Sequence, residues 1–236
     1  MKQNETLSNI HLKDGKIILT DEEIDAVGDN HISTSVETPM RAGAFDQTED
    51  EKIAAIQEKF AEIMDILGLD LTDDSLKGTP KRVAKMYVKE IFNGLNPANK
   101  PQMALFENKY KYNEMLVEKN ISFYSNCEHH FVPIMGKAHV AYISSGKVVG
   151  LSKLNRLVDY FANRPQVQER LTTQIADAMV EILKPMGVIV IIDCEHLCMS
   201  MRGVRKSQAR TTTSAVRGVL RDPATRAEAV SLITNR

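Results

Sequence analysis

Two short segments far apart in the chain hold most of its reactive side chains, and they constrain the fold more than any other feature. One is "FYSNCEHHFVP" (residues 123–133) and the other is "DCEHLCMSMRG" (residues 193–203). They contain six of the nine cysteines and histidines in the sequence: Cys127, His129, His130, Cys194, His196 and Cys198. If these side chains act together, the fold must bring the two segments into contact.

The residue types and their spacing in these segments favour a metal site. Cys127 and His130 follow a C-x-x-H pattern, so both can reach one ion from a single turn, and thiolate with imidazole is a donor set that zinc prefers. A structural site would add both Cys194 and Cys198, whereas a catalytic site would add one of them and leave a position for water. Cys194, His196 and Cys198 alternate along a predicted strand and can share one face, so spacing does not choose between them.

The composition is that of a globular protein and argues against some partners. Of 236 residues, 43% are hydrophobic and 26% charged, and the net charge is −1, which argues against binding nucleic acid or an anionic membrane through the whole surface. The first residues lack the apolar core of a secretory signal, and the longest aliphatic run, Val188 to Ile192, is too short to span a bilayer. We therefore expect a cytoplasmic protein, in which cysteines favour metal binding or catalysis over disulfides.

The polarity of the sequence divides the chain into two parts. Residues 1–48 are polar with weak periodicity, and we expect a poorly ordered extension in which "KIILT" could form a strand without an obvious partner. Residues 49–236 have the patterns of a folded domain. Apolar residues at helical spacing predict one helix from about Asp50, and Thr79 followed by Pro80 predicts the N-cap and first residue of another.

From about residue 115 the apolar period changes and predicts an α+β domain. Strands are expected where apolar residues alternate or form short β-branched runs: 116–125, 136–144, 148–152, 187–200 and 206–216. Helices are expected where apolar residues recur every three or four positions: 151–161, 167–182 after Pro165, and a short one after Pro223. Helices, two strands, two helices and two strands then follow one another, as is typical of an α+β domain.

Basic residues near these segments indicate an anionic ligand. Lys153 and Arg156 share a helix face opposite a leucine stripe, and Arg202 follows the second cysteine segment closely. A solvated helix face is the simpler interpretation of Lys153 and Arg156 taken alone. The sequence has no G-x-x-x-x-G-K-[ST] motif, so a nucleotide would not be held by a Walker loop.

Taken together, these motifs resemble the GTP cyclohydrolase I family. The matching segments are "GTPKR", "SNCEHHFVPIMGKAHVAYI", "GLSKLNR", "RPQVQERLT", "EHLCMSMRGV" and "TTTSAVRG", in this order over residues 50–236. The resemblance implies a tunnelling fold (T-fold), an α+β architecture in which an antiparallel sheet carries helices on one face and sheets of several subunits close into a barrel. It also implies a homodecamer with active sites at subunit interfaces, and a catalytic domain over residues 49–236.

The resemblance implies a role for each site residue. One zinc ion per subunit would have three ligands: Cys127, His130 and Cys198. Three residues would take part in catalysis: His129, His196 and Ser152. Six would bind the substrate, the first two at guanine and the others at the triphosphate: Gln168, Glu169, Arg82, Lys153, Arg156 and Arg202. His196 would handle protons at a purine nitrogen, and Cys194 would only pack within its strand.

The reaction implied by the resemblance is hydrolytic opening of the imidazole ring of GTP. It would give 7,8-dihydroneopterin triphosphate and formate, the first step towards folate or biopterin, and the sequence does not indicate which. Two alternatives are a binding protein of the same fold without turnover and a T-fold enzyme acting on another pterin or a deazapurine. The first would be expected to lack His196 or Glu169, and the second to lack part of the cationic set. All of these residues are present.

Overall fold

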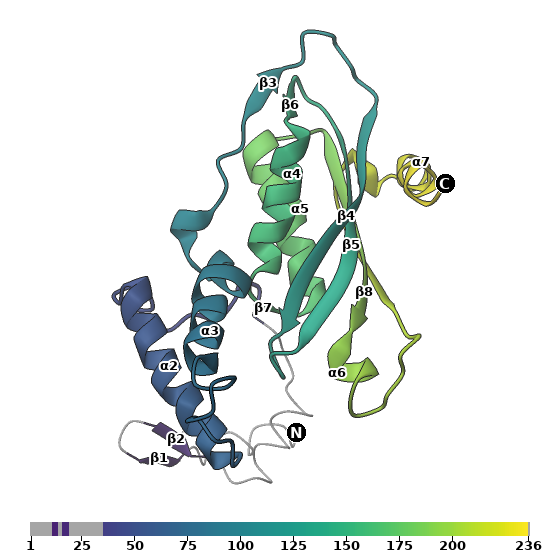
Figure 1. The fold of residues 1–236 in the computed structure, drawn as a ribbon. Coiled ribbons are helices and arrows are strands. Elements are labelled where there is room, and N and C mark those ends of the chain that lie inside the picture. The colour runs from purple at the N-terminus through teal and green to yellow at the C-terminus, as the bar shows by residue number, and fades with distance from the viewer. Residues whose placement is uncertain (1–10, 14–15, 19–34, 236) are drawn as a thin grey trace. The chain divides into compact units, whose positions relative to one another are not determined.

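The computed structural model describes residues 11–13, 16–18 and 35–235, and the chain separates into two units, residues 1–36 and 37–236 (Figure 1). In the first unit, strand β1 (His11–Lys13) pairs antiparallel with β2 (Lys16–Ile18). The segment "KIILT" thus begins with a strand, and its partner is the neighbouring "HLK", which is too short to show a pattern in the sequence. Residues 1–10, 14–15 and 19–34 of the expected extension lie outside the described residues.

Two helices open the second unit. α2 (Glu49–Ile66) starts with a capping box, in which Thr48 exchanges hydrogen bonds with Glu51. α3 (Thr79–Met86) begins one residue before its predicted start because Gly78 already has helical backbone angles and forms the N-cap. α2 packs against α3. A π-helical turn and two 3-10 turns follow: η1 (Tyr87–Ile91), η2 (Asn93–Leu95) and η3 (Pro97–Asn99).

A five-stranded sheet forms the centre of the second unit, in the order β7-β4-β5-β8-β9. Its four long strands are antiparallel neighbours: β4 (Met115–Cys127), β5 (Pro133–Ile143), β8 (Gly187–His196) and β9 (Thr211–Gly218). The short β7 (Pro165–Gln166) pairs parallel with the end of β4. A separate small sheet joins β3 (Leu105–Glu107) and β6 (Lys147–Val149). The predicted α+β class is confirmed.

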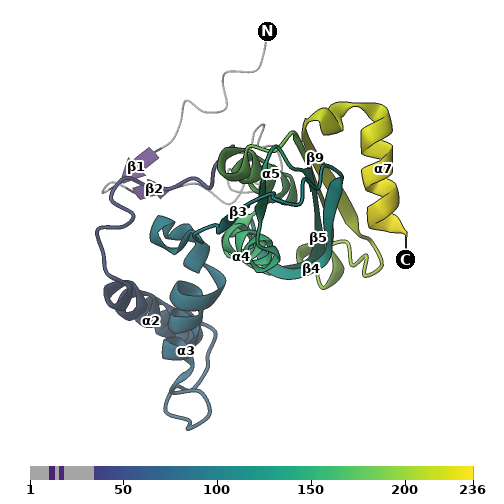
Figure 2. The same ribbon diagram turned by 90° about the horizontal axis from the view of Figure 1, so that it is seen from above.

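Helices cover both faces of this sheet, although the resemblance implied one face only. α4 (Leu151–Ala162) and α5 (Gln168–Leu183) lie against the face that holds the main apolar core. α7 (Pro223–Thr234), capped by Asp222, lies on the opposite side of the strands (Figure 2). There it packs in a second cluster that includes Met115 and Ile189. Within the part of the chain that is described, no helix is long and apolar enough to cross a membrane.

Two predicted boundaries near the cysteine segments were wrong. Pro165 does not start a helix, because it belongs to β7 and α5 begins at Gln168. The strand predicted over 187–200 ends at His196, and a single helical turn, α6 (Leu197–Ser200), follows. The partner strand β5 begins at Pro133, which has no N–H to extend the ladder. Cys198 is therefore on a helical turn and does not share a strand face with Cys194 and His196.

Candidate active site

The turn between β4 and β5 carries the first cysteine segment. Cys127 ends β4, its N–H donates to the Val132 carbonyl at 2.9 Å, and its carbonyl accepts from the Phe131 N–H at 2.9 Å. β7 lies alongside, where Cys127 pairs with Gln166 and the Glu128 N–H donates to the Gln166 carbonyl at 3.0 Å. Backbone hydrogen bonds within the turn and to β7 therefore hold the turn that carries Cys127 and His130.

The sheet brings the two reactive segments together, because β5 pairs with both β4 and β8. One donor atom each from Cys127, His130 and Cys198 lies within 4.8 Å of the other two. Cys127 Sγ is 3.8 Å from His130 Nδ1, and Cys198 reaches the group from α6. Two thiols and an imidazole form a set that could bind a metal ion, and these donor types suit zinc.

Cys194 has a different environment from Cys198. Its side chain is fully buried on the face of β8 that α4 and α5 cover. It lies beside Gly136 of β5, where any larger residue would clash with the Cys194 sulfur. Burial raises the pKa of the Cys194 thiol to about 12, so this sulfur stays protonated. The group formed by the described residues includes Cys198 and leaves Cys194 out, so the four-ligand alternative is not formed.

Cys198 is half-buried, and its thiol responds to its neighbours. Burial raises the pKa of Cys198, the nearby Cys127 sulfur raises it further, and Arg202 opposes both effects. Two sulfurs at this separation resist carrying negative charge together unless a cation lies between them. A bound metal ion would supply that charge and favour both thiolates.

A buried ion pair supports the turn between β4 and β5 (residues 127–132), which we call the metal turn. Arg170 on α5 donates to Glu128 through its two terminal guanidinium nitrogens, Nη1 at 2.5 Å and Nη2 at 3.2 Å, and its side chain is 3% exposed. Glu128 Oε1 also lies 3.8 Å from His129 Nε2. Nothing in the sequence marks Arg170 as part of the site, because "QERLT" shows an arginine on a helix without indicating which way its side chain points. The buried Arg170 side chain therefore links α5 to the metal turn.

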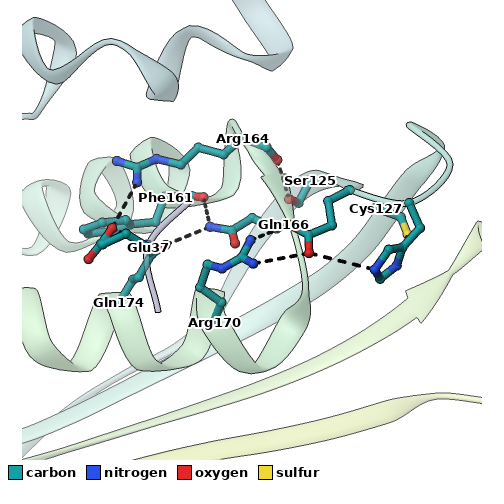
Figure 3. Close-up of polar contacts among 10 residues, drawn as sticks. Glu37, Ser125, Cys127, Phe161, Arg164, Gln166, Arg170 and Gln174 are labelled. Carbon is teal, nitrogen blue, oxygen red and sulfur yellow. Dashed lines mark hydrogen bonds and ion pairs between the residues drawn. The ribbon is translucent and has the colours of Figure 1, made fainter. Parts of the chain in front are cut away.

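Buried polar side chains continue this support away from the turn (Figure 3). Gln166 is fully buried, and its Nε2 donates to the Phe161 carbonyl at 2.9 Å and to Gln174 Oε1 at 2.8 Å. Gln174 in turn donates to Glu37 at 2.7 Å. Ser125 on β4 donates to the Ala162 carbonyl at 2.6 Å. These bonds tie β4, β7, α4 and α5 together beside Cys127.

His196, at the end of β8, faces the first turn of α5. Its Nε2 lies 2.7 Å from Gln168 Oε1. Burial lowers the pKa of His196, and the neighbouring Glu169 carboxylate opposes this shift. Glu169 is exposed, whereas Gln168 is buried. The structure thus places His196, Gln168 and Glu169 in one neighbourhood, and Cys127, His129, His130 and Cys198 in another at the same end of the sheet.

The remaining predicted residues lie elsewhere, apart from Arg202, which is close enough to Cys198 to lower its pKa. Ser152 and Lys153 lie in the first turn of α4 and Arg156 lies at its middle; this helix follows β6 and ends beside β7 (Figure 1). Because a helix of this length spans about 18 Å, Ser152 and Lys153 start far from the metal turn, and Arg156 is about half a helix length closer to it. Arg82 on α3 donates to the Ser75 carbonyl and the Thr79 hydroxyl, within its own segment.

Comparison with known proteins identifies relatives over most of the chain. A sequence profile of GTP cyclohydrolase I matches residues 56–234. The GTP cyclohydrolase 1 of Flavobacterium johnsoniae is 53% identical over 217 residues, which cover 92% of this chain and 97% of the relative. The enzyme of Streptomyces avermitilis is 56% identical over 190 residues, which cover 79% of this chain and 92% of the relative. The enzyme of Vibrio cholerae is 52% identical over 194 residues, which cover 82% of this chain and 88% of the relative. The chain therefore belongs to the GTP cyclohydrolase I family, the enzymes that convert GTP to 7,8-dihydroneopterin triphosphate in pterin and folate biosynthesis.

Proposed function

We propose that this enzyme works with one zinc ion per subunit, held by Cys127, His130 and Cys198. The observation that carries the proposal is the convergence of these three donors within 4.8 Å from two distant segments. Zinc bound by three protein ligands keeps an open coordination position, and there it would act as a Lewis acid and lower the pKa of a water molecule. The burial of Cys194 supports an open site, because among the described residues this third thiol does not join the group.

The neighbouring residues are assigned to the purine. His196 would exchange a proton with a purine nitrogen while the imidazole ring opens at C8 and formate leaves. The Glu169 carboxylate would accept hydrogen bonds from the ring N–H and amino group of guanine. His129 would lie beside the purine or ribose, held near Glu128 at 3.8 Å. Family membership and the shared neighbourhood of these side chains support the assignment.

The triphosphate is assigned to four cations, with Ser152 near the ribose: Arg82, Lys153, Arg156 and Arg202. Guanidinium forks and ammonium groups suit phosphate oxygens. Lys153 starts at the other end of α4 from the metal turn and Arg156 at its middle, so the proposed site would need a second chain to be complete. This separation supports a homodecamer with active sites at subunit interfaces. The edge strand β9 offers backbone groups through which sheets of neighbouring subunits would close the T-fold barrel.

The proposal extends to the organisation and location of the chain. Residues 49–236 would form the catalytic domain and residues 1–48 an extension outside it. α2 begins at Glu49, which supports this boundary. The proposed location is the cytoplasm, where the free thiols of Cys127 and Cys198 would stay reduced and able to bind metal.

The direct test is turnover of GTP by the purified, zinc-loaded protein. We expect stoichiometric formate and a product that gives the fluorescence of neopterin after oxidation and dephosphorylation. Protein stripped of zinc by a chelator should lose this activity and regain it when zinc is returned. GTP binding without formate release by the zinc-loaded protein would indicate a non-catalytic relative of the same fold, and activity on another pterin or a deazapurine alone would indicate a different T-fold enzyme.

A further inference from the structure

The His196 imidazole has a polar partner that the fold holds in place. Its Nε2 lies 2.7 Å from Oε1 of Gln168, the first residue of α5. Gln168 is 2% exposed, so its amide depends on protein groups for its hydrogen bonds. Which end of this amide faces His196 decides what the imidazole can donate or accept.

Three acceptors fix the orientation of the Gln168 amide. Its Nε2 donates to the Ile192 carbonyl at 3.0 Å and to the Thr211 carbonyl at 2.8 Å, and lies 3.1 Å from Thr213 Oγ1. Carbonyl oxygens only accept, so a flipped amide would place Oε1 against two other oxygens with no proton between them. The amide nitrogen must therefore face β8 and β9, and Oε1 must face His196.

Two threonine hydroxyls support the same orientation. The Thr172 hydroxyl donates to the backbone carbonyl of Gln168 at 2.7 Å. Thr172 Oγ1 is then left to accept from the Thr213 hydroxyl, 2.6 Å away. Because Thr213 uses its hydrogen on Thr172, it presents a lone pair to Gln168 Nε2. The chain of bonds is consistent only when the amide nitrogen points towards the strands.

The fixed amide determines the tautomer of His196. Gln168 Oε1 has no proton to give, so His196 Nε2 must be the donor in the bond between them. A neutral imidazole with its proton on Nε2 has its lone pair on Nδ1. Nδ1 is therefore the ring nitrogen that can accept a hydrogen bond or a proton from a substrate.

We infer that Gln168 is a positioning residue that holds His196 as the Nε2–H tautomer and leaves Nδ1 for the substrate. The inference rests on the proposed acid–base role of His196 and differs from the substrate-binding role that the resemblance implied for Gln168. Both amide hydrogens of Gln168 already have protein acceptors on β8 and β9. Guanine recognition at this end of the site is then left to the exposed Glu169.

The first test is the tautomer of His196 in the zinc-loaded wild-type protein. Solid-state ¹⁵N spectra of histidine-labelled protein at about pH 8, where free imidazoles are mostly neutral, separate protonated from unprotonated ring nitrogens. The signals of His196 are those that disappear in His196→Ala. We expect a protonated Nε2 and an unprotonated Nδ1, and the opposite tautomer or an even mixture would overturn the inference.

The second test is Gln168→Met, which keeps the length of the side chain and removes the amide. We expect both tautomers in the His196 signals and a fall in kcat of roughly 10–100-fold, the usual effect of removing the outer partner of a functional histidine, with little change in KM. A rise in KM with kcat unchanged would show that Gln168 binds guanine instead. If this variant does not fold, the wild-type spectrum still decides.

The matched control is Gln174→Met, the same change at another buried glutamine of α5 that bonds to Gln166 and Glu37. This variant should retain a single His196 tautomer. A mixture of tautomers in Gln174→Met would show that any disturbance of α5 changes the His196 tautomer, and that the effect is not specific to Gln168. The spectra also separate this inference from the proposed function. Wild-type protein that shows the expected tautomer but releases no formate from GTP would refute the function alone, whereas full turnover with the opposite tautomer would refute the inference alone.

Discussion

The two ends of helix α4 differ in how their functional side chains are held. At the end beside β7, the metal turn is fixed by backbone bonds and by the buried pair of Arg170 with Glu128. At the other end, Ser152 is exposed and Lys153 is only half-buried, at the start of α4. The difference fits the proposed site, in which one chain would build the metal half in advance, and substrate and a second subunit would complete the half that holds the triphosphate.

The largest effect is expected from removing a metal ligand. Cys198→Ser should lose zinc and detectable turnover, because an open three-ligand site has no spare protein ligand. Cys194→Ala is the matched control and should retain zinc, since Cys194 only packs on β8. Metal analysis of both purified variants checks this. Loss of zinc from Cys194→Ala together with its retention in Cys198→Ser would reverse the ligand assignment.

The next effect concerns His196, at the same end of the sheet. His196→Ala should keep zinc and bind GTP, because the imidazole is not among the metal donors. Formate release should fall by about 10²–10⁴-fold, the usual contribution of a general acid–base group. Zinc content, GTP affinity and formate release are measured on one preparation. Near-normal formate release by the folded, zinc-loaded variant would remove His196 from the mechanism.

The buried ion pair should make the metal end sensitive to a change that touches no ligand. Arg170→Met leaves the Glu128 carboxylate without its bidentate partner and should lower the free energy of unfolding by about 3–5 kcal/mol. Arg217, which pairs with Asp177 at 2.7 Å near the surface, is the matched control, and Arg217→Met should cost less than about 1 kcal/mol. Urea unfolding of both variants makes the comparison. Equal losses of unfolding free energy in the two variants would show that burial does not make the Arg170–Glu128 pair more stabilising than a surface pair.

For the cations of α4 the expected effect is smaller, and it falls on the use of substrate and not on the stability of the fold. Arg156→Ala should reduce kcat/KM for GTP by about 1.5–3 kcal/mol, the range for a charge-assisted hydrogen bond. Its stability should change by no more than about 0.5 kcal/mol, as for other exposed positions. Lys59→Ala, an exposed cation on α2, should change neither quantity. Equal losses of kcat/KM on GTP and guanosine would assign Arg156 to structure.

The sequence predicted the elements of the fold better than the contacts between them. Periodicity located α4, α5 and the four long strands, and the C-x-x-H spacing identified Cys127 and His130. Spacing could not choose between Cys194 and Cys198, because the choice depends on β8 ending at His196, opposite Ile134 of β5. That boundary is set by a partner strand far away in the sequence, which local pattern does not report.

Side-chain partners were also beyond the reach of the sequence. Arg170 is charged and on a helix, yet it is buried because Glu128 lies on a turn that the sheet places opposite α5. The resemblance implied a substrate-binding role for Gln168, and nothing in the sequence indicated that its amide nitrogen donates to carbonyls of β8 and β9. In both cases the deciding contact joins segments more than a helix length apart in the chain, and only the folded structure brings them together.

The proposed site requires that Cys127, His130 and Cys198 alone hold the metal and leave one coordination position open. X-ray absorption at the zinc edge, on protein purified with its metal, measures this directly. We expect two sulfur ligands at about 2.3 Å, one nitrogen at about 2.0–2.1 Å and one oxygen. Three sulfur ligands, which would require Cys194, or four protein ligands with no oxygen would contradict it.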